Sequence, residues 1–271
     1  MVKTNDLKEM LFKVGLYNAS KLDDFDFKFN DNKEYLMHIL KLEYEARTKH
    51  SLEERIKRSK LPKVDTSKKY SGIDEWNMKE LLKLEFIENN QNIILIGKCG
   101  SGKTTAAVQI AEKALKNGNR VHYIKIETLL NVLKTKDSLN KSKKTFDYLI
   151  QCDLIIIDDL MYIPLTDEEW TMFYKTIMFL NESISIIFIT NRRIEEWSDA
   201  TTNKHVVETL VDRIINYSRV VTFKQPKPKL LQPPHKSCSI ILFGCLNLKI
   251  TCRNQNLRDN DKDYVGEFLI F

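Results

Sequence analysis

Residues 97–104 read Gly97-Lys98-Cys99-Gly100-Ser101-Gly102-Lys103-Thr104 and match the pattern G-x-x-x-x-G-K-[ST] at every fixed position. The apolar run Asn92–Ile96 precedes them and is predicted to be a buried strand, and a helix is predicted over Thr105–Lys116. The pattern requires this order of strand, loop and helix, because the loop glycines let backbone N–H groups face an anion at the helix N-terminus. The stretch therefore predicts a phosphate-binding loop.

Two side chains of this loop have specific expected roles. Lys103 would place its ammonium on the β- and γ-phosphates, and the Thr104 hydroxyl would be a ligand of Mg²⁺. Cys99 is either a reactive thiol or a small residue that the turn accommodates. The predicted nucleotide-binding residues are Gly97, Lys98, Cys99, Gly100, Ser101, Gly102, Lys103, Thr104 and Thr105.

Two carboxylates follow another apolar run, Leu154–Ile157. In a parallel sheet, ligands gather at the carboxyl ends of the strands, so Asp158 is expected to face the same crevice as Thr104 and to hold Mg²⁺ through water. Asp159 is expected to orient or activate the attacking water. Thr104 and Asp158 are therefore the predicted metal site.

Two later residues have alternative interpretations. Asn191 ends the apolar run Ile186–Thr190, where it could bind the γ-phosphate or the attacking water, or could act as a turn or helix cap. Arg213 lies in a predicted helix and could be a finger that reaches the nucleotide of a neighbouring subunit. It could equally be a surface arginine that pairs with Asp212 or Glu208.

Length and composition limit the class of protein. The chain has 271 residues, 42% of them hydrophobic and 30% charged, which is enough for a core and excludes wholesale disorder. Five cysteines, an odd number without a C-x-x-C pair, argue against a disulfide framework or a structural zinc site. No apolar run approaches the ~18 residues that a membrane span needs, and no signal peptide is seen, so we expect a cytoplasmic protein without membrane contact.

Basic residues gather in one segment. Residues 47–69 contain nine basic and three acidic side chains, an excess as large as the net charge of +6 of the whole chain. They could contact the phosphates of DNA. They could also form a solvated helical face, since Glu53 and Glu54 lie at helical spacing from Arg and Lys. Amphipathic helices are predicted over residues 32–60, with a break at Leu61-Pro62.

Strand-like runs alternate with helical segments from about residue 73 to 224, which predicts an α/β fold with a five-stranded parallel sheet covered by helices on both faces. We expect a basic, helical N-terminal region over 1–62, an ATPase domain over 63–224, and a poorly packed tail over 225–271. The predicted strands are Asn92–Ile96, Val121–Ile126, Leu154–Ile157, Ile184–Thr190 and Arg219–Phe223.

Together these motifs resemble the IstB-like ATP-binding proteins, helper ATPases of insertion sequences that belong to the P-loop AAA+ class and are similar to the DnaC helicase loaders. Besides the loop, the resemblance rests on Asp158–Leu165, which is close to D-D-x-G-Y-L-P-L, on Ile189–Trp197, and on Leu210–Ile214, which is close to I-L-D-R-L. Met161 stands where the family usually has Gly. The resemblance covers about residues 30–224.

The resemblance implies an ATPase with ATP and Mg²⁺ as cofactors, which hydrolyses ATP to ADP and phosphate. The implied catalytic residues are Lys103, Asp158, Asp159, Asn191 and Arg213. Asn191 would be the sensor, on a strand between the strand of the phosphate loop and the strand of the acidic pair. Arg213 would be an arginine finger that acts on the nucleotide of a neighbouring subunit, that is, in trans. The implied partners are double-stranded DNA, a transposase and further copies of the chain, with nucleotide at the subunit interfaces. The alternatives are a DnaC-like helicase loader and a nucleotide-binding adaptor that does not hydrolyse ATP.

Overall fold

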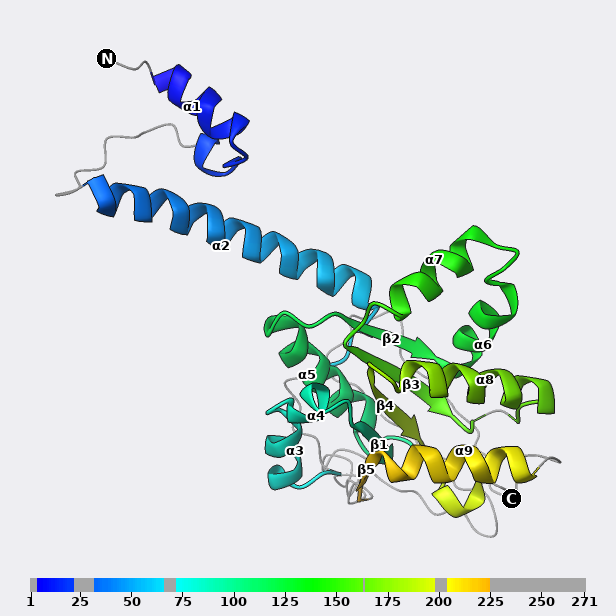
Figure 1. The fold of residues 1–271 in the computed structure, drawn as a ribbon. Helices are drawn as coiled ribbons and strands as arrows, with labels where there is room; N and C mark the ends of the chain where they lie inside the picture. Colours follow the sequence, from blue (N-terminus) through cyan, green and yellow to red (C-terminus); the bar gives the residue numbers. More distant parts are fainter. Residues whose placement is uncertain (1–3, 22–31, 66–71, 163, 198–203, 225–271) are drawn as a thin grey trace, which may run out of the picture. The chain divides into compact units, whose positions relative to one another are not determined.

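The computed structural model describes residues 4–21, 32–65, 72–162, 164–197 and 204–224 (Figure 1). Its contacts divide the chain into two units, Met1–Gln225 and Pro226–Phe271. The predicted tail over 225–271, with three of the five cysteines, lies outside the described residues. The predicted domain limits remain predictions.

Five parallel strands form one sheet in the order β2-β3-β4-β1-β5. This confirms the predicted α/β fold with a five-stranded parallel sheet. It also confirms that the strand before Asn191, β4, lies between the loop strand β1 and the acidic strand β3. The strands are β1 (Asn92–Ile96), β2 (Val121–Lys125), β3 (Leu154–Leu160), β4 (Ser185–Thr190) and β5 (Ser218–Thr222).

The end of β3 differs from the prediction, which stopped this strand at Ile157. The strand continues to Leu160 and includes both Asp158 and Asp159. Its pairing with β4 shifts register between Ile157 and Leu160, and Asp159 has a left-handed backbone with φ of +60°. An irregularity of this kind bends a strand and changes where its side chains point.

Alternate residues of strands β1 to β4 pack against helices on opposite faces of the sheet. On β1, Ile93 belongs to a core with α5 (Lys103–Lys116), whereas Ile94 belongs to a core with α8 (Asp167–Leu180). Both faces are buried because helices cover both, as predicted (Figure 1). Helices α3 (Glu75–Leu81), α4 (Glu85–Glu88) and α5 (Lys103–Lys116) contribute to the first core, and α6 (Ile126–Thr135), α7 (Asn140–Leu149), α8 (Asp167–Leu180) and α9 (Lys204–Asn216) to the second.

The start of α8 shows how local sequence fixes a boundary. Thr166 accepts a hydrogen bond from the backbone N–H of Glu169, and the Glu169 carboxylate accepts one from the backbone N–H of Thr166. This capping box satisfies two backbone donors that the first turn of a helix leaves open. Trp170 and Phe173 follow on the buried face of α8.

The N-terminal region contains α1 (Thr4–Lys13), the short 3₁₀ helix η1 (Ala19–Lys21) and one long helix, α2 (Asn32–Ser59). The buried carboxylate of Glu43 on α2 accepts hydrogen bonds from the backbone N–H groups of Asn18 and Ala19 and from the guanidinium of Arg47. Desolvation alone would raise the pKa of the Glu43 carboxyl, but these hydrogen bonds together hold it below its usual value. The buried Glu43 carboxylate therefore links the start of η1 to α2 by hydrogen bonds.

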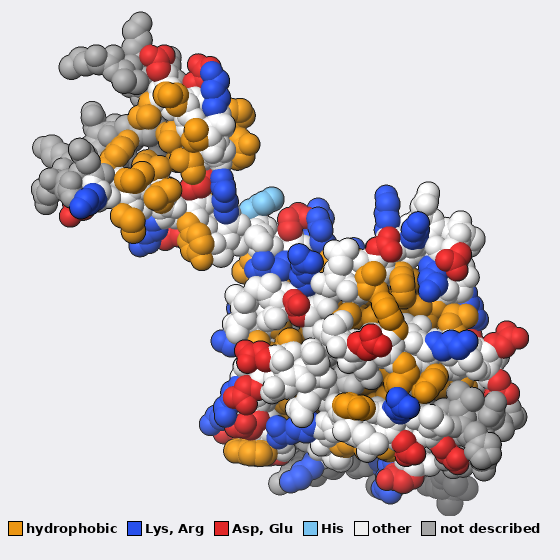
Figure 2. Space-filling model, in the orientation of Figure 1, with side chains coloured by type: hydrophobic (Ala, Val, Ile, Leu, Met, Phe, Trp, Pro, Cys, Tyr) orange, Lys and Arg blue, Asp and Glu red, His pale blue; other side chains and the backbone are white. Residues whose placement is uncertain are grey.

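The amphipathic face predicted for residues 32–60 is buried only in part. Ile39 is buried, but Leu36, Leu40 and Ile56 are exposed, and Tyr44 has 71% of its surface exposed. Figure 2 shows hydrophobic side chains open to solvent in the N-terminal helical region. At the other end of α2, the backbone carbonyl of Arg58 accepts a hydrogen bond from His122 Nδ1 on β2. Within the described residues, every helix is too short or too polar to cross a lipid bilayer.

Candidate nucleotide-binding site

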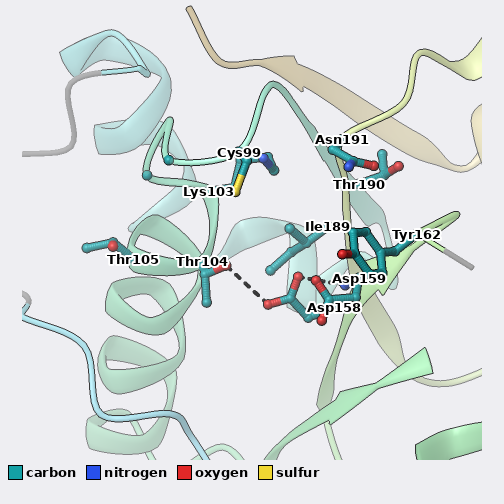
Figure 3. Close-up of a pocket in the computed structure, with 12 residues that line it drawn as sticks. Cys99, Lys103, Thr104, Thr105, Asp158, Asp159, Tyr162, Ile189, Thr190 and Asn191 are labelled. Atoms are coloured by element: carbon teal, nitrogen blue, oxygen red, sulfur yellow. Dashed lines mark hydrogen bonds between the residues drawn. The ribbon is translucent and has the colours of Figure 1, made fainter. Parts of the chain in front are cut away.

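A cavity of about 320 Å³ opens at the carboxyl end of the central strands (Figure 3). Its walls come from the loop after β1, the first turn of α5, the end of β3 and the end of β4. Nine of the residues singled out from the sequence are among those that line it. The lining residues are Cys99, Gly100, Gly102, Lys103, Thr104, Thr105, Asp158, Asp159, Tyr162, Ile189, Thr190 and Asn191.

The loop takes its shape from its glycines. Gly100 and Gly102 have φ of +76° and +93°, in the region where L-residues are strained. A Cβ atom on Gly97 would lie 2.7 Å from Cβ of Phe223, which follows β5, so only glycine fits there. The remaining predicted loop residues, Lys98 and Ser101, do not line the cavity, and the Ser101 side chain is fully buried.

Lys103 lies inside the curve of the loop. Its ammonium donates hydrogen bonds to the backbone carbonyls of Gly97 and Lys98, at 2.5 Å and 2.9 Å. Only 8% of the residue is exposed, and this burial lowers the pKa of Lys103 from its ordinary value. The loop thus holds a cation at the wall of the cavity.

Asp158 joins the loop to the acidic strand. Its Oδ2 accepts a hydrogen bond from the Thr104 hydroxyl at 3.1 Å and another from the Tyr123 hydroxyl at 2.7 Å (Figure 3 shows the first). Its Oδ1 accepts one from the backbone N–H of Asp159 at 2.7 Å. Burial, together with the bond to Asp158, raises the pKa of the Tyr123 phenol. The two predicted metal ligands are therefore direct neighbours.

Asp159 has a different partner. Its Oδ2 accepts a hydrogen bond from the ammonium of Lys125, at 2.7 Å, in an ion pair in which both side chains are partly exposed. This pairing raises the pKa of Lys125. Lys125 and Tyr123 both lie on β2, and the sequence reasoning missed both. Only the register of β2 against β3 brings them to the acidic pair.

The turn after the acidic pair contains a second left-handed residue. Met161, which takes the place of the Gly in the resembled pattern D-D-x-G-Y-L-P-L, has φ of +68° and is 3% exposed. An L-residue in this conformation costs about 1–2 kcal/mol. The strained backbone is tolerated because the Met161 side chain packs in the core with α8.

The last two predicted residues have different surroundings. Asn191 is exposed at the end of β4 and lines the cavity between the loop and the acidic strand. Arg213 is exposed on α9 and is not one of the described residues that line the cavity.

The sequence profile of the IstB-like ATP binding protein family matches residues 12–232. The chain belongs to this family. The match confirms the resemblance found in the sequence and extends beyond residues 30–224; it covers α2 and the whole sheet. The family is named for ATP binding, so the cavity described above is the candidate nucleotide site of this IstB-like chain.

Relatives carry names that refer to insertion sequences and ATP binding. A protein of insertion sequence IS21 from Pseudomonas aeruginosa is 28% identical over 197 residues, which are 71% of this chain and 74% of the relative. An IS21-like protein from Bacteroides fragilis is 29% identical over 193 residues, 69% of this chain and 73% of the relative.

Two solved structures are similar to the IstB-like chain. The DnaC helicase loader has a TM-score of 0.46 and 19% identity, and the match covers 55% of this chain and 87% of the loader. The replication initiator DnaA bound to AMPPCP and single-stranded DNA has a TM-score of 0.49 and 20% identity, with coverages of 60% and 50%.

Proposed function

We propose that this IstB-like protein binds ATP and Mg²⁺ in the cavity at the end of the sheet, hydrolyses the ATP, and acts on double-stranded DNA as the helper ATPase of an insertion-sequence transposase. The observation that carries the proposal is the meeting of Lys103, Thr104 and Asp158 around one cavity. Membership of an ATP-binding family supports the choice of nucleotide.

The loop fits a triphosphate. Gly102 is the N-cap of α5 and has no side chain to bond the first-turn N–H groups, so these donors are available to an anion. The buried ammonium of Lys103 adds a full positive charge at the same wall. A cavity of about 320 Å³ lies within the range of sites for small molecules.

The donor set near the loop fits Mg²⁺. Thr104 and Asp158 offer a hydroxyl and a carboxylate, the hard oxygen ligands that this cation prefers. Thr104 would hold the cation directly and Asp158 through water. When bound, Mg²⁺ neutralises charge on the phosphate oxygens.

The other side chains of the site would position the reactants. Asp159 would orient the attacking water, with one carboxylate oxygen held by Lys125. Asn191 would act as the sensor, donating its amide N–H to a γ-phosphate oxygen. Arg213 would reach the nucleotide of a neighbouring subunit, because it is exposed on α9, so we propose a homo-oligomer with nucleotide at its interfaces.

The basic residues of α2 support a contact with DNA. Figure 2 shows Lys and Arg side chains exposed along α2 and around its C-terminal end. Lys57 and Arg58 pair with Glu54 only at 3.9 Å and 3.7 Å and stay largely exposed. Such side chains can bind phosphates without sequence preference and with strong dependence on salt. The proposed DNA-binding region over 1–62 would then precede an ATPase domain over 63–224.

The proposal is tested by ATP turnover, measured against protein concentration with and without duplex DNA. We expect turnover per chain to rise with concentration and with DNA, and Asp159→Asn to abolish it while ATP still binds. Nucleotide binding without turnover under any of these conditions would identify a non-hydrolysing adaptor. Co-purification with a hexameric helicase would identify a helicase loader.

A further inference from the structure

We infer that Tyr123 is a positioning residue for the metal-binding carboxylate of Asp158, an inference that rests on the proposed function. The Tyr123 hydroxyl donates to Oδ2 of Asp158 at 2.7 Å, and the same oxygen accepts the bond from Thr104 at 3.1 Å. Tyr123 thus acts on the metal site through another residue and is not among those that line the cavity.

The sheet fixes this contact. Tyr123 on β2 pairs in register with Ile156 on β3, two residues before Asp158. Residues two apart on a strand share a face of the sheet, and a diagonal neighbour lies within reach of a long aromatic side chain. The Tyr123 ring packs against the core on the α5 face, so the backbone and the ring together hold the hydroxyl in place.

The contact restricts a carboxylate that would otherwise be weakly held. The backbone N–H of Asp159 holds Oδ1 of Asp158, but this N–H belongs to the irregular end of β3, where Asp159 is left-handed. The Thr104 hydroxyl donates a hydrogen bond to Oδ2 of Asp158, but Thr104 is itself an expected ligand of the metal. Among the described residues, Tyr123 is therefore the one donor to Oδ2 of Asp158 that is not itself a proposed metal ligand.

The chemistry of the donor suits this role. A phenol fixes the carboxylate without adding a positive charge beside a cation site. On the same strand, Lys125 brings an ammonium to Asp159, the residue proposed to orient water. Strand β2 thus supplies a neutral donor to Asp158 and a positively charged donor to Asp159. Hydrogen-bond partners of metal ligands commonly affect metal affinity about 10–100-fold, and we expect the lower end of this range because Asp158 would hold the cation through water.

The test compares wild type with Tyr123→Phe, which removes one oxygen and keeps the ring. Binding of a fluorescent ATP analogue is titrated at a series of free Mg²⁺ concentrations and again in EDTA. We expect the Mg²⁺ concentration at half-maximal effect to rise about 10-fold in the variant. Affinity in EDTA should equal that of wild type, because Tyr123 does not contact the nucleotide cavity.

Tyr148→Phe is the matched control, since the Tyr148 hydroxyl on α7 is buried and has no hydrogen-bond partner among the described residues. It should leave the Mg²⁺ midpoint unchanged. An unchanged midpoint in Tyr123→Phe, or an equal loss of affinity in EDTA, would overturn the role of Tyr123. Failure of wild type to bind the analogue at any Mg²⁺ concentration would instead overturn the proposed function.

Discussion

The hydroxyl of Thr104 lies 3.1 Å from a carboxylate oxygen of Asp158, 54 positions further along the chain. Thr104 is in the first turn of α5, directly after the loop, and Asp158 is near the end of β3. The carboxyl ends of parallel strands share one edge of the sheet, so the fold brings both oxygens to one cavity. In the proposed site, Mg²⁺ would lie at this junction of the loop after β1 and the end of β3.

The left-handed backbone of Met161 predicts an unusual order of stability. Met161→Ala removes a buried side chain and keeps the strained backbone, so it should lower the free energy of unfolding by about 2–5 kcal/mol. Met161→Gly removes the same side chain but relieves the strain, and should be about 1 kcal/mol more stable than Met161→Ala. Urea unfolding measures both values.

Met178, half-buried within α8, provides the control for this pair. In a helix glycine is less favourable than alanine by about 1 kcal/mol, so Met178→Gly should be less stable than Met178→Ala. If Met161→Gly were less stable than Met161→Ala, as expected at Met178, the backbone of Met161 would not be left-handed in solution.

The sequence predicted the loop and the acidic pair because each depends on residues that are adjacent in the chain. Strand β1 has the predicted bounds, Asn92–Ile96, since its apolar run ends where the loop begins. Tyr123 and Lys125 were missed because their partners lie on another strand, and alternation of apolar residues does not reveal register. The extension of β3 through Asp159 was missed because polar residues at the end of an apolar run are typical of a loop.

Burial of His122 predicts a pH dependence of stability. Desolvation lowers the pKa of His122 in the folded protein; the charge of Lys60 acts in the same direction, and the bond to the Arg58 carbonyl opposes it. Below the ordinary value of about 6.5, the unfolded chain takes up a proton that the folded protein does not. Stability should therefore fall as the pH drops from 7 to 5.

The variant His122→Gln should weaken this fall, as measured by urea unfolding at a series of pH values. His50→Gln, at an exposed position of α2, should keep the pH dependence of wild type. Parallel curves for wild type and His122→Gln would mean that His122 titrates alike in the folded and unfolded chains.

The position of Arg213 on α9 predicts a separation of binding from turnover. Arg213→Ala should leave ATP affinity unchanged, because the residue does not line the cavity of its own chain. Turnover should fall by about 10³-fold or more at concentrations where wild type assembles, since the finger charge is lost. Lys175→Ala, at an exposed position of α8, should retain wild-type turnover, and equal turnover in Arg213→Ala would make Arg213 a surface residue.

The most direct test of the nucleotide site is the dissociation constant for ATP in the presence of Mg²⁺, compared between wild type and Lys103→Ala, with the exposed Lys116→Ala on α5 as control. Loss of the buried ammonium should weaken binding at least about 30-fold, while Lys116→Ala should bind as wild type does. Unchanged affinity in Lys103→Ala would contradict the assignment of residues 97–104 as the phosphate-binding loop.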